Sequence, residues 1–187
     1  MQKEGMVKDP IVDQLFSFLS HKVQIQNALG WLESGKITVG DASLYELKQT
    51  HKHQILKALF RSKHFEHDTK METMDMVLAD DKSDTADRCR AACMASLPDA
   101  EVKAKIWAEV TDPNNKDSAY IKQAKMGSFY VAEQLDLIEP YFDKFYDVLP
   151  QAFKTMSHKN FASFFLCMLP RVGDIKDEHI VKLVCLK

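Results

Sequence analysis

The chain has 187 residues, of which 45% are hydrophobic and 28% charged, and its formal net charge is −2. This composition is typical of a globular protein with a proper core, and it excludes a disordered chain. The near-neutral charge and the lack of any dense lysine and arginine run indicate no nucleic-acid partner.

The sequence also predicts no membrane association. No stretch approaches the roughly 18 consecutive apolar residues that a membrane span requires. The first ten residues, "MQKEGMVKDP", carry charges and lack the apolar segment of a signal peptide. Four scattered cysteines fit reduced thiols in a cytoplasmic protein: Cys89, Cys93, Cys167 and Cys185.

In chain order, the first predicted helix begins at Asp9-Pro10, because proline is tolerated in a first helical turn. The segment 34–41, "SGKITVGD", then interrupts the helical pattern with two glycines. Its Ile-Thr-Val centre resembles a strand but is too short and isolated to build a sheet, so we expect no strand pair. A helix with Ile55, Leu56, Leu59 and Phe60 on one face follows.

Turn residues divide the second half of the chain. "DDKSD" at 80–84 separates two helices, and Asp84 or Thr85 is the expected cap of the second. Pro98-Asp99 begins the next helix, and "TDPNNKD" at 111–117 is a turn by composition. Two further breaks are expected at Leu149-Pro150 and at 169–174, "LPRVGD".

The helical period is strongest near the C-terminal end. One apolar face, at spacings of three and four residues, is formed by Ile138, Tyr141, Phe142, Phe145, Tyr146 and Leu149. We therefore predict an all-α protein of about ten helices, arranged as stacked antiparallel pairs in a HEAT- or armadillo-like superhelical array. The whole chain, 1–187, is expected to form a single helical domain.

The residues alone give no catalytic or metal site. His64 and His67 share a helix face and could hold a metal, but we favour a solvated helix end. Cys89 and Cys93, one helical turn apart, are better explained as small buried thiols than as metal ligands. No H-E-x-x-H, P-loop, G-x-G-x-x-G or G-x-S-x-G motif is present.

One group of basic residues could form a concave cationic patch: Arg88 and Arg90 with Lys122 and Lys125. The simpler interpretation is a solvated helix face, and we favour it. On its residues, the chain is predicted to be a helical scaffold or interaction domain.

The order of several segments is more specific than any one motif. "ALGWLESGKIT" is followed by "SLYELKQTHKHQILKALFRSKHF" and "DKSDTADRCRAACMASLPDAEVKAKIWAEVTDPNN". "QAKMGSFYVAEQLDLIEPYFDKFYDVLPQAF" comes next, and a Phe-rich helix closes with "FFLCMLPRVGD". This order resembles the C-terminal helical domain of zinc aminopeptidases of the aminopeptidase N and puromycin-sensitive type, over nearly the whole chain.

Three details carry the resemblance. The first is the group Pro98, Asp99, Lys103 and Trp107. The second is Met126-Gly127-x-Phe129, followed by Gln134, Pro140-Tyr141-Phe142 and Phe145-Tyr146. The third is Leu169-Pro170 after the Phe-rich helix.

The resemblance implies a non-catalytic cap and the C-terminal part of a longer enzyme. In that family, a helical array closes the substrate chamber over a separate catalytic domain, which removes N-terminal residues from peptides. The zinc site and the G-A-M-E-N motif belong to that domain, so this chain is expected to hold no cofactor. Its expected partners are the parent's catalytic domain and peptides, with Arg88, Arg90 and Arg171 as candidate peptide contacts chosen from charge.

Two alternatives stay open. The chain could be an autonomous helical-repeat adaptor that binds a protein or peptide on a concave face. A severed cap should expose an apolar docking patch, whereas a free adaptor should have polar helices at both ends. A metal or redox protein built on the histidine and cysteine pairs is the weakest alternative.

Overall fold

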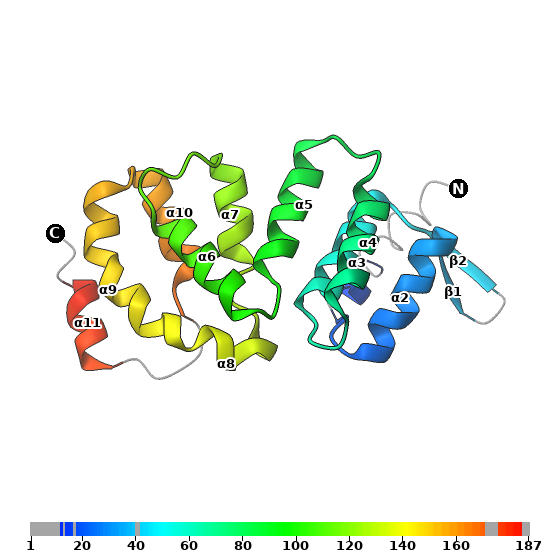
Figure 1. Cartoon of the computed structure of the whole chain (residues 1–187), viewed down its shortest axis with the longest axis horizontal. Helices are drawn as coiled ribbons and strands as arrows, with labels where there is room; N and C mark the ends of the chain where they lie inside the picture. Colours follow the sequence, from blue (N-terminus) through cyan, green and yellow to red (C-terminus); the bar gives the residue numbers. More distant parts are fainter. Residues whose placement is uncertain (1–11, 13, 17, 40–41, 171–175, 185–187) are drawn as a thin grey trace. The chain divides into compact units, whose positions relative to one another are not determined.

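The computed structural model describes residues 12, 14–16, 18–39, 42–170 and 176–184. Over these residues the protein is mostly helical, with about eleven helices and one small two-stranded sheet (Figure 1). Within the same residues, no helix combines the length and apolar character needed to cross a membrane. The chain divides into two compact units, Met1–Ala86 and Asp87–Lys187. The expectation of one domain over 1–187 stays a prediction.

In the part of the chain that the structure describes, the first unit packs helices and a hairpin around a largely aliphatic core. Its elements are α2 (Lys22–Ser34), β1 (Lys36–Val39), β2 (Ala42–Glu46), α3 (Gln49–Arg61) and α4 (His67–Leu78). The predicted apolar face of α3 is confirmed, since Ile55, Leu56, Leu59 and Phe60 are all buried. The helix start expected at Asp9-Pro10 lies outside the described residues.

The expectation that no strand pair forms is wrong. β1 and β2 pair antiparallel, with Lys36 opposite Glu46 and Ile37 opposite Tyr45. A strand of this length is stable here because its partner follows directly in the chain and because Ile37 is buried beside α2. The Ile-Thr-Val run is too short and isolated for a larger sheet, but a hairpin packed against a helix needs no further strand.

Gly35 provides the turn between α2 and β1. It ends α2 in the left-handed region, with φ of 69°, and its carbonyl accepts a hydrogen bond from the Leu47 N–H at 2.9 Å. Only glycine adopts this conformation without strain. The end of the helix and the start of the hairpin therefore depend on one backbone position.

Two glycine substitutions should change stability in opposite directions. Gly35→Ala is expected to lower the free energy of unfolding by about 1 kcal/mol, because an added Cβ would be strained at positive φ. Gly30→Ala, inside α2 and with open space around the added Cβ, should raise it by about 0.5 to 1 kcal/mol. Urea unfolding followed by circular dichroism measures both changes in the free energy of unfolding. Changes of the same sign in the two variants would contradict the backbone conformations of the two glycines.

The second unit contains most of α5 (Asp84–Ala95) and the remaining helices. They are α6 (Ala100–Thr111), α7 (Ala119–Gly127), the 3₁₀ turn η1 (Ala132–Gln134), α8 (Leu135–Ile138), α9 (Pro140–Thr155), α10 (His158–Met168) and α11 (Asp177–Val184). α7 packs beside α10, and α11 packs along α9 (Figure 1). The core between them is rich in aromatic residues, including Phe129, Tyr141, Phe145, Tyr146 and Phe164.

Two predicted helix boundaries are corrected. The expected break at Leu149-Pro150 does not occur, because Pro150 lies inside α9. Burial of Phe145, Leu149 and Ala152 on the same helix outweighs the roughly 3 kcal/mol that an interior proline costs. The cap of α5 is Ser83 rather than Asp84 or Thr85, since the Ser83 Oγ accepts a hydrogen bond from the Ala86 N–H at 3.3 Å.

Lysines at the same helical position connect successive helices. Lys70, the fourth residue of α4, donates from its Nζ to the Ser62 carbonyl at 2.7 Å, directly after α3. Lys103, the fourth residue of α6, donates to the Ala95 carbonyl at 3.0 Å, at the end of α5. Both lysines are buried, and both reach back eight residues to a helix C-terminus, where a cation is favourable. The two units thus share one local design for joining a helix to the next.

Candidate functional site

The best candidate for an interaction site is a groove between α5, α6 and α7, here called the α5–α6–α7 groove. Arg90 and Lys125, two residues of the predicted cationic patch, line it. Its volume is about 490 Å³. Apolar side chains line it together with charged ones of both signs: Ala91, Met94, Val102, Ile106 and Ile121, with Asp87, Arg90, Lys105, Glu109 and Lys125. Such a surface suits contact with an amphipathic segment, because the apolar residues supply contact area and the charges supply orientation.

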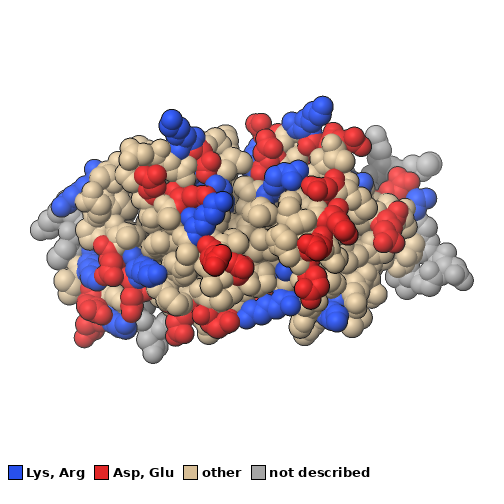
Figure 2. Space-filling view, viewed as in Figure 1, with Lys and Arg blue, Asp and Glu red and all other residues tan. Residues whose placement is uncertain are grey.

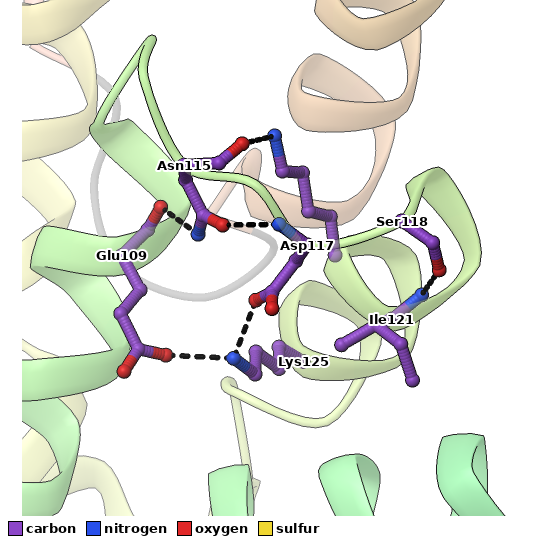
Figure 3. Close-up of polar contacts among 7 residues, drawn as sticks. Glu109, Asn115, Asp117, Ser118, Ile121 and Lys125 are labelled. Atoms are coloured by element: carbon purple, nitrogen blue, oxygen red, sulfur yellow. Dashed lines mark hydrogen bonds and ion pairs between the residues drawn. The ribbon is translucent and has the colours of Figure 1, made fainter.

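Lys125 lies at the centre of an ion-pair network on one wall of this groove. Its Nζ lies 2.8 Å from Glu109 Oε2 and 2.6 Å from Asp117 Oδ2, so α6, the following turn and α7 are joined (Figure 3). Burial lowers the pKa of Lys125, but the hydrogen bonds to Asp117 and Glu109 outweigh it and the pKa is raised. The hydrogen bond from Lys125 in turn lowers the pKa of Asp117. Lys125 and Asp117 therefore stay charged at neutral pH.

Asn115 anchors the predicted turn between α6 and α7. Its Nδ2 donates to the Glu109 carbonyl at 2.6 Å, and its Oδ1 accepts from the Asp117 N–H at 2.7 Å (Figure 3). Lys122 Nζ donates to the Asn115 carbonyl at 2.6 Å. Ser118 caps α7 by accepting from the Ile121 N–H. The turn expected from "TDPNNKD" is confirmed, and its polar residues hold α7 in place.

The ion-pair network predicts a pH-dependent contribution to stability. Asp117→Asn should lower the free energy of unfolding by about 1 kcal/mol near neutral pH, since the pair is only partly shielded from water. Because the folded-state pKa of Asp117 lies below the ordinary 3.8, this contribution is present above that value and is lost as the pH falls through the lowered pKa. Chemical unfolding at a series of acidic pH values tests this. A difference that persists after Asp117 is protonated, or an equal loss in Glu72→Gln, an exposed carboxylate, would contradict it.

The structure separates the predicted peptide-contact residues. Arg90 lines the α5–α6–α7 groove. The Arg88 guanidinium instead lies over the Tyr120 ring, 4.8 Å from its centroid. Arg171 lies outside the described residues. The proposed patch of Arg88, Arg90, Lys122 and Lys125 is not a continuous cationic surface, because carboxylates or carbonyls hold the two lysines, and Figure 2 shows acidic and basic side chains intermixed.

The histidines and cysteines are placed as ordinary structural residues. His64 and His67 are exposed, as a solvated helix end predicts, whereas His51 and His53 are buried. Burial lowers the pKa of His53 even though its Nε2 lies 3.4 Å from Asp81 Oδ2. In the described part of the chain, no three potential ligands of the His, Cys, Asp and Glu types form a metal-binding group.

Cys89 and Cys93 are confirmed as buried thiols. Their Sγ atoms lie 4.0 Å apart on one face of α5, which is too far for a disulfide bond. Cys167 is only partly buried. Cys185 lies outside the described residues.

Several of the residues that carry the family resemblance meet at the core of the second unit. Asp99 caps α6 by accepting from the Val102 N–H at 2.8 Å. Lys103 Nζ donates to the Phe129 carbonyl at 2.8 Å, in addition to its bond with Ala95. Measured between ring centroids, Trp107 lies 6.0 Å from Phe129 and 5.2 Å from Tyr141.

Gln134 completes this arrangement from the 3₁₀ turn. Its Nε2 donates to the Ser96 carbonyl at 2.8 Å, across 38 residues of sequence. In the sequence, Lys103 and Gln134 stand out only as parts of a motif, and their role is not apparent. Their burial could not be read from the sequence, although the fourth position after a helix cap is where a lysine reaches the preceding helix end.

Comparison with known proteins assigns no family. No model of a known protein family matches the chain, and a search of curated proteins finds no match. The resemblance to zinc aminopeptidases therefore stays a prediction from the sequence.

Proposed function

We propose that this chain is the non-catalytic C-terminal cap domain of a zinc metallo-aminopeptidase. In this role it closes the substrate chamber over a separate catalytic domain of the same parent chain, which holds the zinc and removes N-terminal residues from peptides. The cap supplies walls and a rigid body for that chamber and performs no chemistry itself. A cytoplasmic location, indicated by the cysteines, belongs to the same proposal.

The convergence of the resemblance residues is the observation that carries this proposal. Lys103 and Trp107 on α6 meet Phe129 after α7, Gln134 in η1 and Tyr141 on α9 in one core. Residues with such long-range roles specify a particular packing of helices. A match at these positions therefore supports a shared fold more strongly than a match at exposed positions would.

The lysine contacts support the finer prediction of a HEAT- or armadillo-like array. The α3–α4 and α5–α6 junctions use the same element, a buried lysine at the fourth position of the second helix. A local design that recurs along the chain is expected of stacked helix pairs built from degenerate repeats.

Exposed apolar residues support docking onto another domain. In the first unit, Phe18 is 64% and Val23 65% exposed. In the second, α11 exposes Ile180, Val181 and Val184, the last of them at 71%. A free adaptor would be expected to end in a polar helix, so these faces favour a cap over an autonomous protein. The α5–α6–α7 groove is the feature that favours an adaptor, which stays the second candidate.

Immunoprecipitation tests the proposal. An antibody raised against this chain should precipitate, from cells that express the protein, an aminopeptidase activity that bestatin and a zinc chelator both abolish. The matched control is the same antibody saturated beforehand with the purified chain, which should precipitate no activity. If the protein is recovered in the precipitate without aminopeptidase activity, the cap-domain proposal is wrong and the adaptor is favoured.

A further inference from the structure

A second cavity lies on the side of α7 that faces α10, and is here called the α7–α10 cavity. Its volume is about 180 Å³, and it is formed by the turn after α6, the first turns of α7 and α10, and the end of α9. Core residues form part of its wall, since Val110, Met126 and Phe164 line it and are each no more than 5% exposed. A small apolar group in the cavity would therefore contact the core of the second unit.

The polar part of the lining is rich in hydrogen-bond donors. Lys122 and Lys159 contribute two cations, and Gln123 and Asn160 contribute side-chain amides. Asp112 is the one carboxylate among the lining residues, and its Oδ1 already accepts from the Asn114 N–H at 2.8 Å. The balance of the lining is therefore cationic.

Lys122, one of the two lysines of the lining, is held in place before any ligand binds. Lys122 Nζ is fixed 2.6 Å from the Asn115 carbonyl, within the turn that the Lys125 network anchors. Tyr120 lines the cavity, and the Arg88 guanidinium lies 4.8 Å from the centre of its ring, which adds a third cation nearby. The positive ends of the α7 and α10 dipoles also favour an anion in the cavity, because the first turns of both helices line it.

We propose that the α7–α10 cavity binds a carboxylate that carries a short branched apolar group. The apolar group would contact Val110, Met126 and Phe164, and the carboxylate would accept hydrogen bonds at the lysine side. This chemistry occurs both in free small acids and at the C-terminal residue of a peptide. The inference is independent of the proposed cap function, because it depends only on side chains within the second unit.

Titration of the isotopically labelled full chain with 4-methylpentanoate, followed by amide chemical shifts, tests the proposal. We expect saturable shifts at residues that line the cavity, with a Kd of about 1 mM, as suits a ligand with few atoms. Acetate lacks the apolar group and 4-methylpentanamide lacks the charge, so each should bind at least about tenfold more weakly. Equal binding of 4-methylpentanamide, or no saturable shift at these residues, would overturn the proposal.

A pair of peptides distinguishes the two sources of the carboxylate. An acetylated tripeptide that ends in leucine with a free carboxylate is compared with the same peptide as its C-terminal amide. Tighter binding of the peptide acid than of 4-methylpentanoate identifies a peptide end as the natural ligand. Binding of 4-methylpentanoate alone identifies a free small acid, and both results support the site.

Two lysine variants test where the carboxylate binds. Lys159→Gln should raise the Kd of 4-methylpentanoate by about three- to tenfold, because it removes a cation from the lining. Lys154→Gln removes an exposed lysine of α9 that does not line the cavity, and it should leave the Kd unchanged. Equal effects of the two substitutions would show that only the net charge matters, and would overturn the assignment of the site. Unchanged circular dichroism verifies that both variants are folded.

Discussion

Replacement of Lys103 with alanine is expected to lower the free energy of unfolding by about 4 kcal/mol. Lys103 is 0% exposed, and its Nζ bridges the carbonyls of Ala95 and Phe129. The substitution leaves a cavity and two buried carbonyls without their donor, and each of these effects is costly. Lys105→Ala is the matched control on the same helix, because Lys105 is exposed and should change stability by less than about 0.5 kcal/mol. Equal midpoints of urea unfolding for the two variants would refute this role of Lys103.

Lys103 should also make stability depend on pH in a defined direction. Burial lowers the pKa of its amine to about 7, whereas the unfolded chain keeps the ordinary value of 10.5. Between these values the unfolded state binds more protons than the folded state, so stability should rise with pH. The free energy of unfolding should increase by about 2 kcal/mol from about pH 6 to pH 9, relative to Lys103→Met, which cannot titrate. A constant difference between the two proteins would show that the amine stays charged.

Replacement of Phe129 with alanine should lower the free energy of unfolding by a similar amount, about 4 kcal/mol. The Phe129 ring is fully buried and lies 5.0 Å from Tyr141 and 6.0 Å from Trp107, between centroids. The substitution removes the centre of the aromatic cluster on which the family resemblance depends. Phe153→Ala is the matched control, because that ring is 39% exposed and its loss should cost about 1 kcal/mol. Calorimetry on both variants measures the two losses of stability. A larger loss in Phe153→Ala than in Phe129→Ala would contradict the account.

Sequence periodicity predicted the helices well where one face was strongly apolar. The face of α9 is an example, since Tyr141, Phe145, Tyr146 and Leu149 are all buried as expected. Asp99 was also predicted correctly as the start of a helix, because a cap acts through its own neighbours. Such features depend on a few adjacent residues, and one sequence is enough to recognise them.

The errors have a common cause in contacts that are distant in sequence. Pro150 was expected to end a helix, but the burial of residues on both sides of it keeps α9 continuous. The hairpin is not apparent from its own residues, because α2 packs against β1 and buries Ile37 only in the folded chain. Local propensity is a weak guide wherever tertiary burial contributes more free energy than the local preference.

The candidate sites were only partly predictable for the same reason. Arg88, Arg90, Lys122 and Lys125 were grouped by charge, but the structure distributes them between the α5–α6–α7 groove and the surroundings of the α7–α10 cavity. Asp117 and Glu109 neutralise Lys125 from two different elements. No spacing rule identifies such partners before the turn between α6 and α7 is placed.

The size of the native polypeptide tests the central claim most directly. An antibody against this chain should detect, in denaturing gels of cells that express the protein, a band several times larger than the 21.4 kDa of this sequence. Mass spectrometry of that band should recover peptides with the H-E-x-x-H and G-A-M-E-N motifs of a zinc aminopeptidase, which would establish the cap domain. A band near 21.4 kDa without such peptides would contradict the account and identify a free-standing helical adaptor.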